Sequence, residues 1–174
     1  MTSSQFSTPP IELGRAAAGA VRLLPLGRSS CTSLAAGIVA MEPWSVMNYP
    51  AETLAAFLAR PDGGTSRYVV SVNGDEAGAI SVRHPWLKGP YLELLALLPQ
   101  AQDQGIGSSI LAWFESAALQ HRARNLWVCA SSFNARGLRF YERHGFTRAA
   151  KLPGLVADGY DEILLRKFPL RPGA

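Results

Sequence analysis

Hydrophobic and polar positions repeat along the chain with two periods, one typical of helices and one typical of strands. Helices are expected over Ser29–Met41, Pro50–Arg60, a segment from Gly107 to about Arg122, and a segment from Asn134 to Gly145. Strands are expected over Ala20–Pro25, Arg67–Val72, Ala77–Arg83, Tyr91–Leu98, Asn125–Ala130, Phe146–Ala150 and Asp161–Phe168. This order predicts a mixed α/β fold around one central sheet.

Local signals support several of these elements. Asn73-Gly74-Asp75-Glu76 between two strand patterns is a strong hairpin signal. Pro50 suits the first turn of a helix, and Pro61 ends the same helix. Tyr91–Leu98 is almost continuously apolar, which is typical of a strand that is buried on both faces.

The domain boundaries follow from composition. Residues 1–19 are small and polar, with two prolines, and predict a flexible N-terminal arm. Residues 20–169 form one domain, and residues 170–174 form a C-terminal tail. A chain of 174 residues that is 48% hydrophobic can bury a sizeable core, which excludes disorder as its main state.

Charge and cysteine content indicate which partners and which cellular compartment to expect. The net charge of +4 would help attract an anionic ligand but does not specify nucleic acid. Cys31 and Cys129 make no disulfide framework, and no apolar run approaches the roughly 20 residues that span a bilayer. The N-terminus lacks the pattern of a signal peptide. We therefore expect a cytoplasmic protein with neither a nucleic-acid nor a membrane partner.

The segment with the clearest chemistry lies between the apolar strand and the third helix. The strand runs into a short loop, and Gly105-Ile106-Gly107 leads directly into the helix. The first N–H groups of a helix lack partners inside it, so glycines there let an anion such as a diphosphate approach the backbone. The same glycines would also permit a tight strand–helix turn. No Lys-Ser/Thr pair of a P-loop follows, and Ile110 stands where a dinucleotide fingerprint needs a small residue.

Two motifs in this half of the chain resemble those of the GCN5-related N-acetyltransferases (GNAT). The first is Leu97-x-Pro99-x-x-Gln102-x-x-Gly105-x-Gly107, which fits the family pattern V-x-P-x-x-Q/R-x-x-G-x-G/A except for leucine in place of valine. The second reads Asn134-x-x-Gly137-x-x-x-Tyr141-Glu142-x-x-Gly145-Phe146. The expected element order also fits the family over roughly residues 20 to 168, which implies the GNAT fold in a single domain.

The resemblance implies that acetyl-CoA is the co-substrate. Its diphosphate would lie on the loop amides of Gln102, Asp103, Gln104, Gly105, Ile106, Gly107 and Ser108. Its pantetheine arm would pair with the main chain of Leu95, Ala96 and Leu97. Asn134 matches a position that often contacts this arm, although it could equally be a plain helix N-cap.

The same comparison implies two catalytic residues. Tyr141 matches the general acid that protonates the departing thiolate, although it could also be a core tyrosine. Glu93 is the only carboxylate in its apolar strand and shares a face with Tyr91 and Leu95 by strict alternation. It stands six residues before the motif proline, where many family members carry a glutamate. We expect a general base there, acting through water, or alternatively a carboxylate paired with an arginine.

The resemblance implies a primary amine as acceptor, and its identity stays open: a small molecule, a protein N-terminus or a lysine. Its pocket is expected between Trp44, Met47 and Tyr49 on one side and Leu152–Tyr160 on the other. Enzymes that acetylate ribosomal-protein N-termini carry a catalytic glutamate on the strand where this chain has Cys129, so this narrower assignment is not made.

Several further alternatives remain open from the sequence. Arg136, Arg139 and Arg143 share a helix face that could meet the 3′-phosphate of CoA or simply be solvated. The three histidines show no metal-ligand spacing, so no metal is expected. A homodimer is possible. A non-catalytic acyl-CoA-binding sensor or partner-binding module is the alternative to an enzyme.

Overall fold

A computed structural model describes residues 6–170 and confirms the mixed α/β prediction. Eight strands form one sheet in the order β1-β2-β3-β4-β5-β6-β8-β7. All neighbouring strands are antiparallel except β5 and β6. The strands are β1 Ile11–Ala16, β2 Gly19–Pro25, β3 Thr65–Val72, β4 Asp75–Trp86, β5 Gly89–Leu97, β6 Leu126–Ser131, β7 Thr147–Pro153 and β8 Asp161–Lys167.

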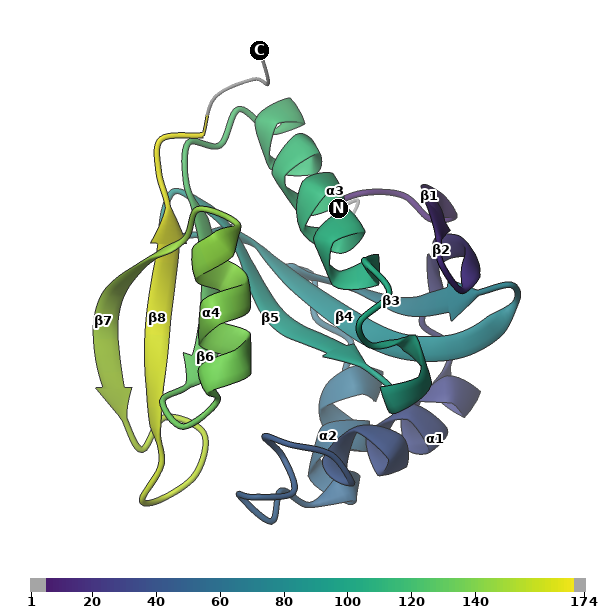
Figure 1. The fold of residues 1–174 in the computed structure, drawn as a ribbon, viewed down its shortest axis with the longest axis horizontal. Coiled ribbons are helices and arrows are strands. Elements are labelled where there is room, and N and C mark those ends of the chain that lie inside the picture. Colours follow the sequence, from purple (N-terminus) through teal and green to yellow (C-terminus); the bar gives the residue numbers. More distant parts are fainter. Residues whose placement is uncertain (1–5, 171–174) are drawn as a thin grey trace.

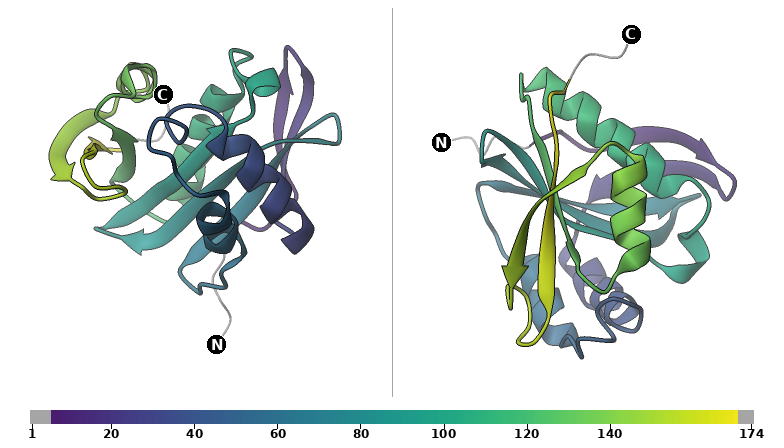
Figure 2. Two further views of the ribbon diagram at one scale, coloured as in Figure 1. Left: turned by 90° about the horizontal axis from the view of Figure 1, so that it is seen from below. Right: turned by 60° about the vertical axis from the view of Figure 1, so that its left-hand side comes forward.

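Four α-helices cover the two faces of this sheet (Figure 1). They are α1 Arg28–Val39, α2 Ala51–Ala59, α3 Ile106–Gln120 and α4 Ala135–Arg143, with a short 3-10 turn, η1, at Pro99–Ala101. One core cluster packs α3 and α4 against the sheet, and a second packs α1 and α2 against the opposite face (Figure 2). No helix within the described residues is long and apolar enough to span a membrane.

The turn between β3 and β4 shows how local sequence sets the register. Asn73 and Gly74 both have positive φ angles, 53° and 99°, as a two-residue type I′ turn requires. The β3–β4 ladder then runs from Val72↔Asp75 to Thr65↔Arg83. The hairpin prediction is confirmed, with β4 extending to Trp86, three residues beyond the predicted end.

The N-terminal segment differs from the prediction of a loose arm over residues 1–19. Ile11–Ala16 forms edge strand β1, which pairs with β2 from Ile11↔Leu23 to Ala16↔Gly19. The small residues after β1 make a tight reversal, and Gly14, at a φ of 93°, lies at a register shift that bends the strand. Residues 1–5 of the predicted arm lie outside the described residues.

Phe6 anchors the start of the described chain to the core. Its side chain is only 3% exposed, and its ring stacks on His121 with the centroids 5.1 Å apart. The Phe6 backbone N–H donates to Ser66 Oγ at 2.9 Å, and the Tyr68 hydroxyl donates to the Ser7 carbonyl at 2.7 Å. At the other end, Leu170, assigned to the tail, is buried and donates its N–H to the Arg124 carbonyl. Residues 171–174 lie outside the described residues.

Replacing Phe6 with alanine tests whether this segment belongs to the folded domain. Deleting a fully buried ring leaves a cavity, so we expect Phe6→Ala to lower the free energy of unfolding by roughly 3–5 kcal/mol. Leu87→Ala removes a side chain that is 58% exposed and should change it by less than about 0.5 kcal/mol. Urea unfolding of both variants measures the difference. Equal stabilities would restore the loose-arm prediction.

Candidate active site

The site forms where β5 and β6 separate. Their parallel pairing covers only Tyr91↔Trp127 and Leu92↔Val128. On its other edge, β5 stays paired with β4 as far as Leu97. In Figure 1, β6 and β8 therefore diverge from β4 and β5.

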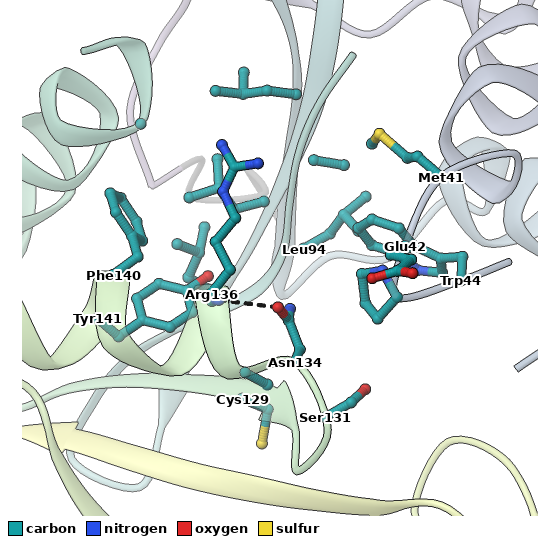
Figure 3. Close-up of a pocket in the computed structure, with 18 of the residues that line it drawn as sticks. Met41, Glu42, Trp44, Leu94, Cys129, Ser131, Asn134, Arg136, Phe140 and Tyr141 are labelled. Atoms are coloured by element: carbon teal, nitrogen blue, oxygen red, sulfur yellow. Dashed lines mark hydrogen bonds between the residues drawn. The ribbon is translucent and has the colours of Figure 1, made fainter. Parts of the chain in front are cut away.

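A cavity of about 1020 Å³ occupies this opening. Its walls come from β5, from the glycine loop with the start of α3, from the end of β6 with α4, and from the segments before α2 and between β7 and β8. In Figure 3, Tyr141 and Asn134 lie across the cavity from Glu42 and Trp44. The cavity thus joins the predicted cofactor segments to the predicted acceptor segments.

The glycine loop has the conformation that anion binding requires. Gly105 is the N-cap of α3, with a φ of 80°, and no side chain caps the helix. A Cβ at Gly105 would have no atom within 4 Å, so the approach to the loop is open. The first N–H groups of α3 belong to Ile106, Gly107 and Ser108, which all line the cavity. A diphosphate fits this arrangement of backbone donors and helix dipole.

Helix α4 and its C-cap residue, His144, make three contacts with the same loop and the start of α3. A Cβ at Gly107 would lie 3.1 Å from the Phe140 ring, so this glycine lets α3 and α4 approach closely. The His144 ring nitrogen Nε2 lies 3.0 Å from Ser108 Oγ. The Arg136 guanidinium pairs with Asp103 at 2.6 Å, which offsets an acidic charge that would otherwise repel a diphosphate. Arg143 also lines the cavity, whereas Arg139 is not among its lining residues.

Asn134, the N-cap of α4, and Tyr141, on α4 itself, both line the cavity. The Asn134 side chain accepts a hydrogen bond from the Gly137 N–H at 2.9 Å, so its capping role is confirmed, and the residue also lines the cavity. Tyr141 is 8% exposed and packs against Phe140 and Phe146. Burial raises the pKa of the Tyr141 phenol, and the neighbouring Cys129 adds to the effect. The phenol is thus protonated at neutral pH, as an ordinary tyrosine also is.

Glu93 lines the cavity but is also ion-paired. Its Oε1 accepts from Arg83 Nε at 2.5 Å, and its Oε2 accepts from the Ser81 hydroxyl at 2.9 Å. The register shifts between Ser81↔Leu94 and Val82↔Leu92, which leaves Glu93 in a β-bulge. Strict alternation, which placed Leu95 on the face of Glu93, is therefore wrong: Leu95 packs against the α3 side of the sheet.

Sequence reasoning missed a second carboxylate at the site. Glu162 on β8 is 5% exposed and lines the cavity. It pairs in register with Ser131, whose hydroxyl donates to Glu162 Oε1 at 2.6 Å. Burial raises the pKa of Glu162, while the Ser131 hydrogen bond acts in the opposite direction. The signal used for Glu93, a single carboxylate in an apolar strand, does not hold for Glu162, because β8 also carries Asp161, Arg166 and Lys167 and Glu162 stands at its charged start.

Cys129, on β6, also lines the cavity, and its thiol interacts electrostatically with Tyr141 and Glu162. Its thiol interacts with Tyr91, and burial raises the pKa of Cys129 to about 11. Hence the protonated thiol, rather than the nucleophilic thiolate, is present at neutral pH. Its environment is that of a structural thiol.

The predicted acceptor segments meet at the far end of the cavity. Trp44, Met47 and Tyr49 line it, together with Leu155 and Val156 from the β7–β8 loop. The Tyr160 hydroxyl donates to the Val46 carbonyl at 3.0 Å and joins the two segments.

Most of the predicted site residues therefore come together. All of the predicted cofactor residues except Gln104 line the cavity, as does Glu93. The Gln104 side chain instead donates to the Gln100 carbonyl within its own loop. Over residues 6–170, the structure brings together no group of three or more His, Cys, Asp and Glu side chains that could hold a metal ion.

A comparison with known proteins identifies the family of this chain. The sequence model of the Acetyltransferase (GNAT) family matches residues 34–146. No curated protein matches the chain.

Several solved structures share the fold. The ribosomal-protein-S18-alanine N-acetyltransferase from Escherichia coli has a TM-score of 0.67 at 19% identity, over 88% of this chain and 96% of that one. Ard1 from Thermoplasma volcanium has a TM-score of 0.69 at 20% identity, over 87% and 99%. A GNAT family acetyltransferase from Elizabethkingia anophelis with acetyl-CoA bound has a TM-score of 0.59 at 16% identity, over 75% and 87%.

The family match covers both sequence motifs and most of the cavity wall, and the fold agrees with it. The chain belongs to the GNAT family of acetyltransferases and is an acyl-CoA-dependent N-acetyltransferase.

Proposed function

We propose that the protein transfers the acetyl group of acetyl-CoA to a primary amine by direct attack on the thioester. The observation that carries this proposal is the continuous cavity, which runs from the α3 N-terminus past Tyr141 to Glu93 and Glu162. An anionic cofactor, a proton donor and carboxylates for a cationic amine each find suitable groups along it. The acceptor is a small molecule, a protein N-terminus or a lysine.

The donor side relies on backbone groups and on Asn134. The diphosphate would accept hydrogen bonds from the first N–H groups of α3, at Ile106 to Ser108. The pantetheine arm would lie along Leu95 to Leu97, where β5 has separated from β6. Peptide-like amides in the arm can satisfy strand groups that β6 no longer reaches.

The transfer step needs one proton removed and one supplied. An amine is largely protonated at neutral pH, so its ammonium must lose a proton before the nitrogen can attack. The N–C bond then forms, the C–S bond breaks, and the thiolate takes a proton. Tyr141 would supply that proton, because its phenol is protonated at neutral pH and the residue lines the cavity.

We assign removal of the ammonium proton to Glu93, acting through water. Each Glu93 oxygen already accepts one hydrogen bond, from Arg83 or from Ser81. A carboxylate oxygen has a second lone pair, so a water in the cavity can still bind it. The two existing bonds would hold the carboxylate in one position.

A non-catalytic acyl-CoA-binding module is the second candidate, and the site argues against it. Such a module needs the glycine loop but has no use for a proton donor and carboxylates along the same cavity. Measurement of CoA thiol release with an amine present separates the two functions.

Gly105→Glu tests the diphosphate loop. A carboxylate there would repel the diphosphate, so the Kd for acetyl-CoA should rise at least about tenfold in titration calorimetry. Gly74→Glu is the matched control, because Gly74 also has a positive φ, and a Cβ added there would likewise meet no atom within 4 Å. The control should bind like the parent. Equal affinities of all three proteins would contradict the assignment of the loop.

Tyr141→Phe tests the proton donor. The phenyl ring keeps the packing but loses the acid, so kcat should fall by about 10²- to 10⁴-fold while acetyl-CoA affinity is preserved. Steady-state thiol release and calorimetry measure the two quantities. Tyr68→Phe, which removes another buried phenol but lies outside the cavity, serves as the control. Unchanged turnover in Tyr141→Phe would remove its role as an acid.

Glu93→Gln tests the base through the pH profile of kcat/KM. Without the carboxylate, activity near neutral pH should fall by about 10²-fold and recover as rising pH deprotonates the amine. Asp62→Asn is the control, because Asp62 is the other carboxylate paired with Arg83, at 2.9 Å, and does not line the cavity. If the two variants have the same profile, Glu93 acts only by holding Arg83.

A further inference from the structure

The charges along the cavity are divided between its two ends. Its lining cations, Arg136 and Arg143, both come from α4 beside the glycine loop. The lining carboxylates away from that loop are Glu42, Glu93 and Glu162. Among the described residues, neither lysine nor arginine lines the acceptor end. The acceptor end is therefore anionic.

Among the described residues, Glu162 is the buried lining carboxylate without a charged partner, whereas Glu42 is exposed to solvent. The Glu93 charge is balanced by Arg83, whereas Glu162 accepts a hydrogen bond only from the neutral Ser131 hydroxyl among the described residues. Its side chain is 5% exposed. Buried carboxylates are almost always paired, because removing the charge from water is costly. An ammonium group in the cavity would supply the missing partner.

The mouth of the same end is apolar. Leu155 and Val156 line the cavity and are 56% and 44% exposed. Val46, next to the lining residue Met47, is 39% exposed. The Tyr160–Val46 hydrogen bond holds the two loops together, and Trp44 and Met47 continue the apolar wall inward. Exposed apolar side chains that gather around a cavity mark a surface that a ligand covers.

We propose that the acceptor is a primary amine on an apolar body, with no anionic group next to the nitrogen. Its ammonium group binds Glu162, and its apolar body lies against Trp44, Met47 and the β7–β8 loop. An α-carboxylate would bring a second negative charge close to Glu162, with no cation on the described wall of the acceptor end to receive it. Arylalkylamines and N-termini whose own carboxyl is an amide meet the requirement, and free amino acids do not. This inference rests on the proposed acetyl transfer.

Three amines that carry the same phenyl ring test the acceptor class. Phenethylamine and phenylalaninamide lack the carboxylate that phenylalanine carries. At saturating acetyl-CoA, kcat/KM measured by thiol release should be at least about tenfold higher for phenethylamine and for phenylalaninamide than for phenylalanine. If only phenethylamine is preferred over phenylalanine, the acceptor is a small arylalkylamine. If phenylalaninamide is the best of the three substrates, the acceptor is a peptide N-terminus. Equal or better use of phenylalanine would overturn the proposal.

Glu162→Gln tests the residue itself. Glutamine keeps the shape and can still accept from Ser131, but it removes the charge. The KM for phenethylamine should rise at least about tenfold, and the preference over phenylalanine should shrink by a similar factor. Glu142→Gln is the charge-matched control, since Glu142 pairs with Arg148 and does not line the cavity. Unchanged discrimination in Glu162→Gln would overturn the proposal.

Acetyl-CoA binding separates failure of this inference from failure of the proposed function. Calorimetry on Glu162→Gln should give the parental affinity, which shows that the variant is folded. If the parent binds acetyl-CoA but transfers to none of the three amines, the acceptor class is wrong. If the parent does not bind acetyl-CoA, the proposed function fails first.

Discussion

The separation of β5 from β6 is the constraint on which the site depends. A strand inside a sheet has its backbone groups paired along both edges, and β5 is paired with β4 from Tyr91 to Leu97. Toward β6, its register ends after Leu92. The space that opens beyond that position lets an extended, amide-bearing ligand take the place of a strand. Because β5 stays fixed by β4, its unpaired edge is rigid and prepared for binding.

Helix packing gives that opening its chemical character. Helix α3 begins at the end of the loop that follows β5, so its unpartnered N–H groups face the same space as the open strand edge. Close contact at Gly107 and Phe140 brings α4 beside this helix start, and α4 also carries Tyr141. The glycine that permits the approach of two helices therefore also places a proton donor on the cavity wall.

The sequence predicted what depends on neighbouring residues and missed what depends on distant ones. The Asn73-Gly74 turn, the Asn134 cap and the start of a helix at the glycine loop have short-range causes, and the structure confirms these three features. Strand β1 pairs through a turn of small residues that composition alone could not distinguish from a loose segment. The position of Glu93 depends on a bulge relative to β4, and alternation cannot reveal a bulge.

The two carboxylates show why a site cannot be derived from residue type alone. Glu93 and Glu162 both stand on strands and line one cavity, yet their environments differ. Arg83 comes from the strand next to Glu93 and balances its charge, while the partner of Glu162 across to β6 is the neutral Ser131 hydroxyl. A fixed, neutralised carboxylate suits the ordering of a water molecule. A buried, uncompensated carboxylate favours a cation, and the ammonium group of the acceptor is the cation that amine acetylation brings into this cavity.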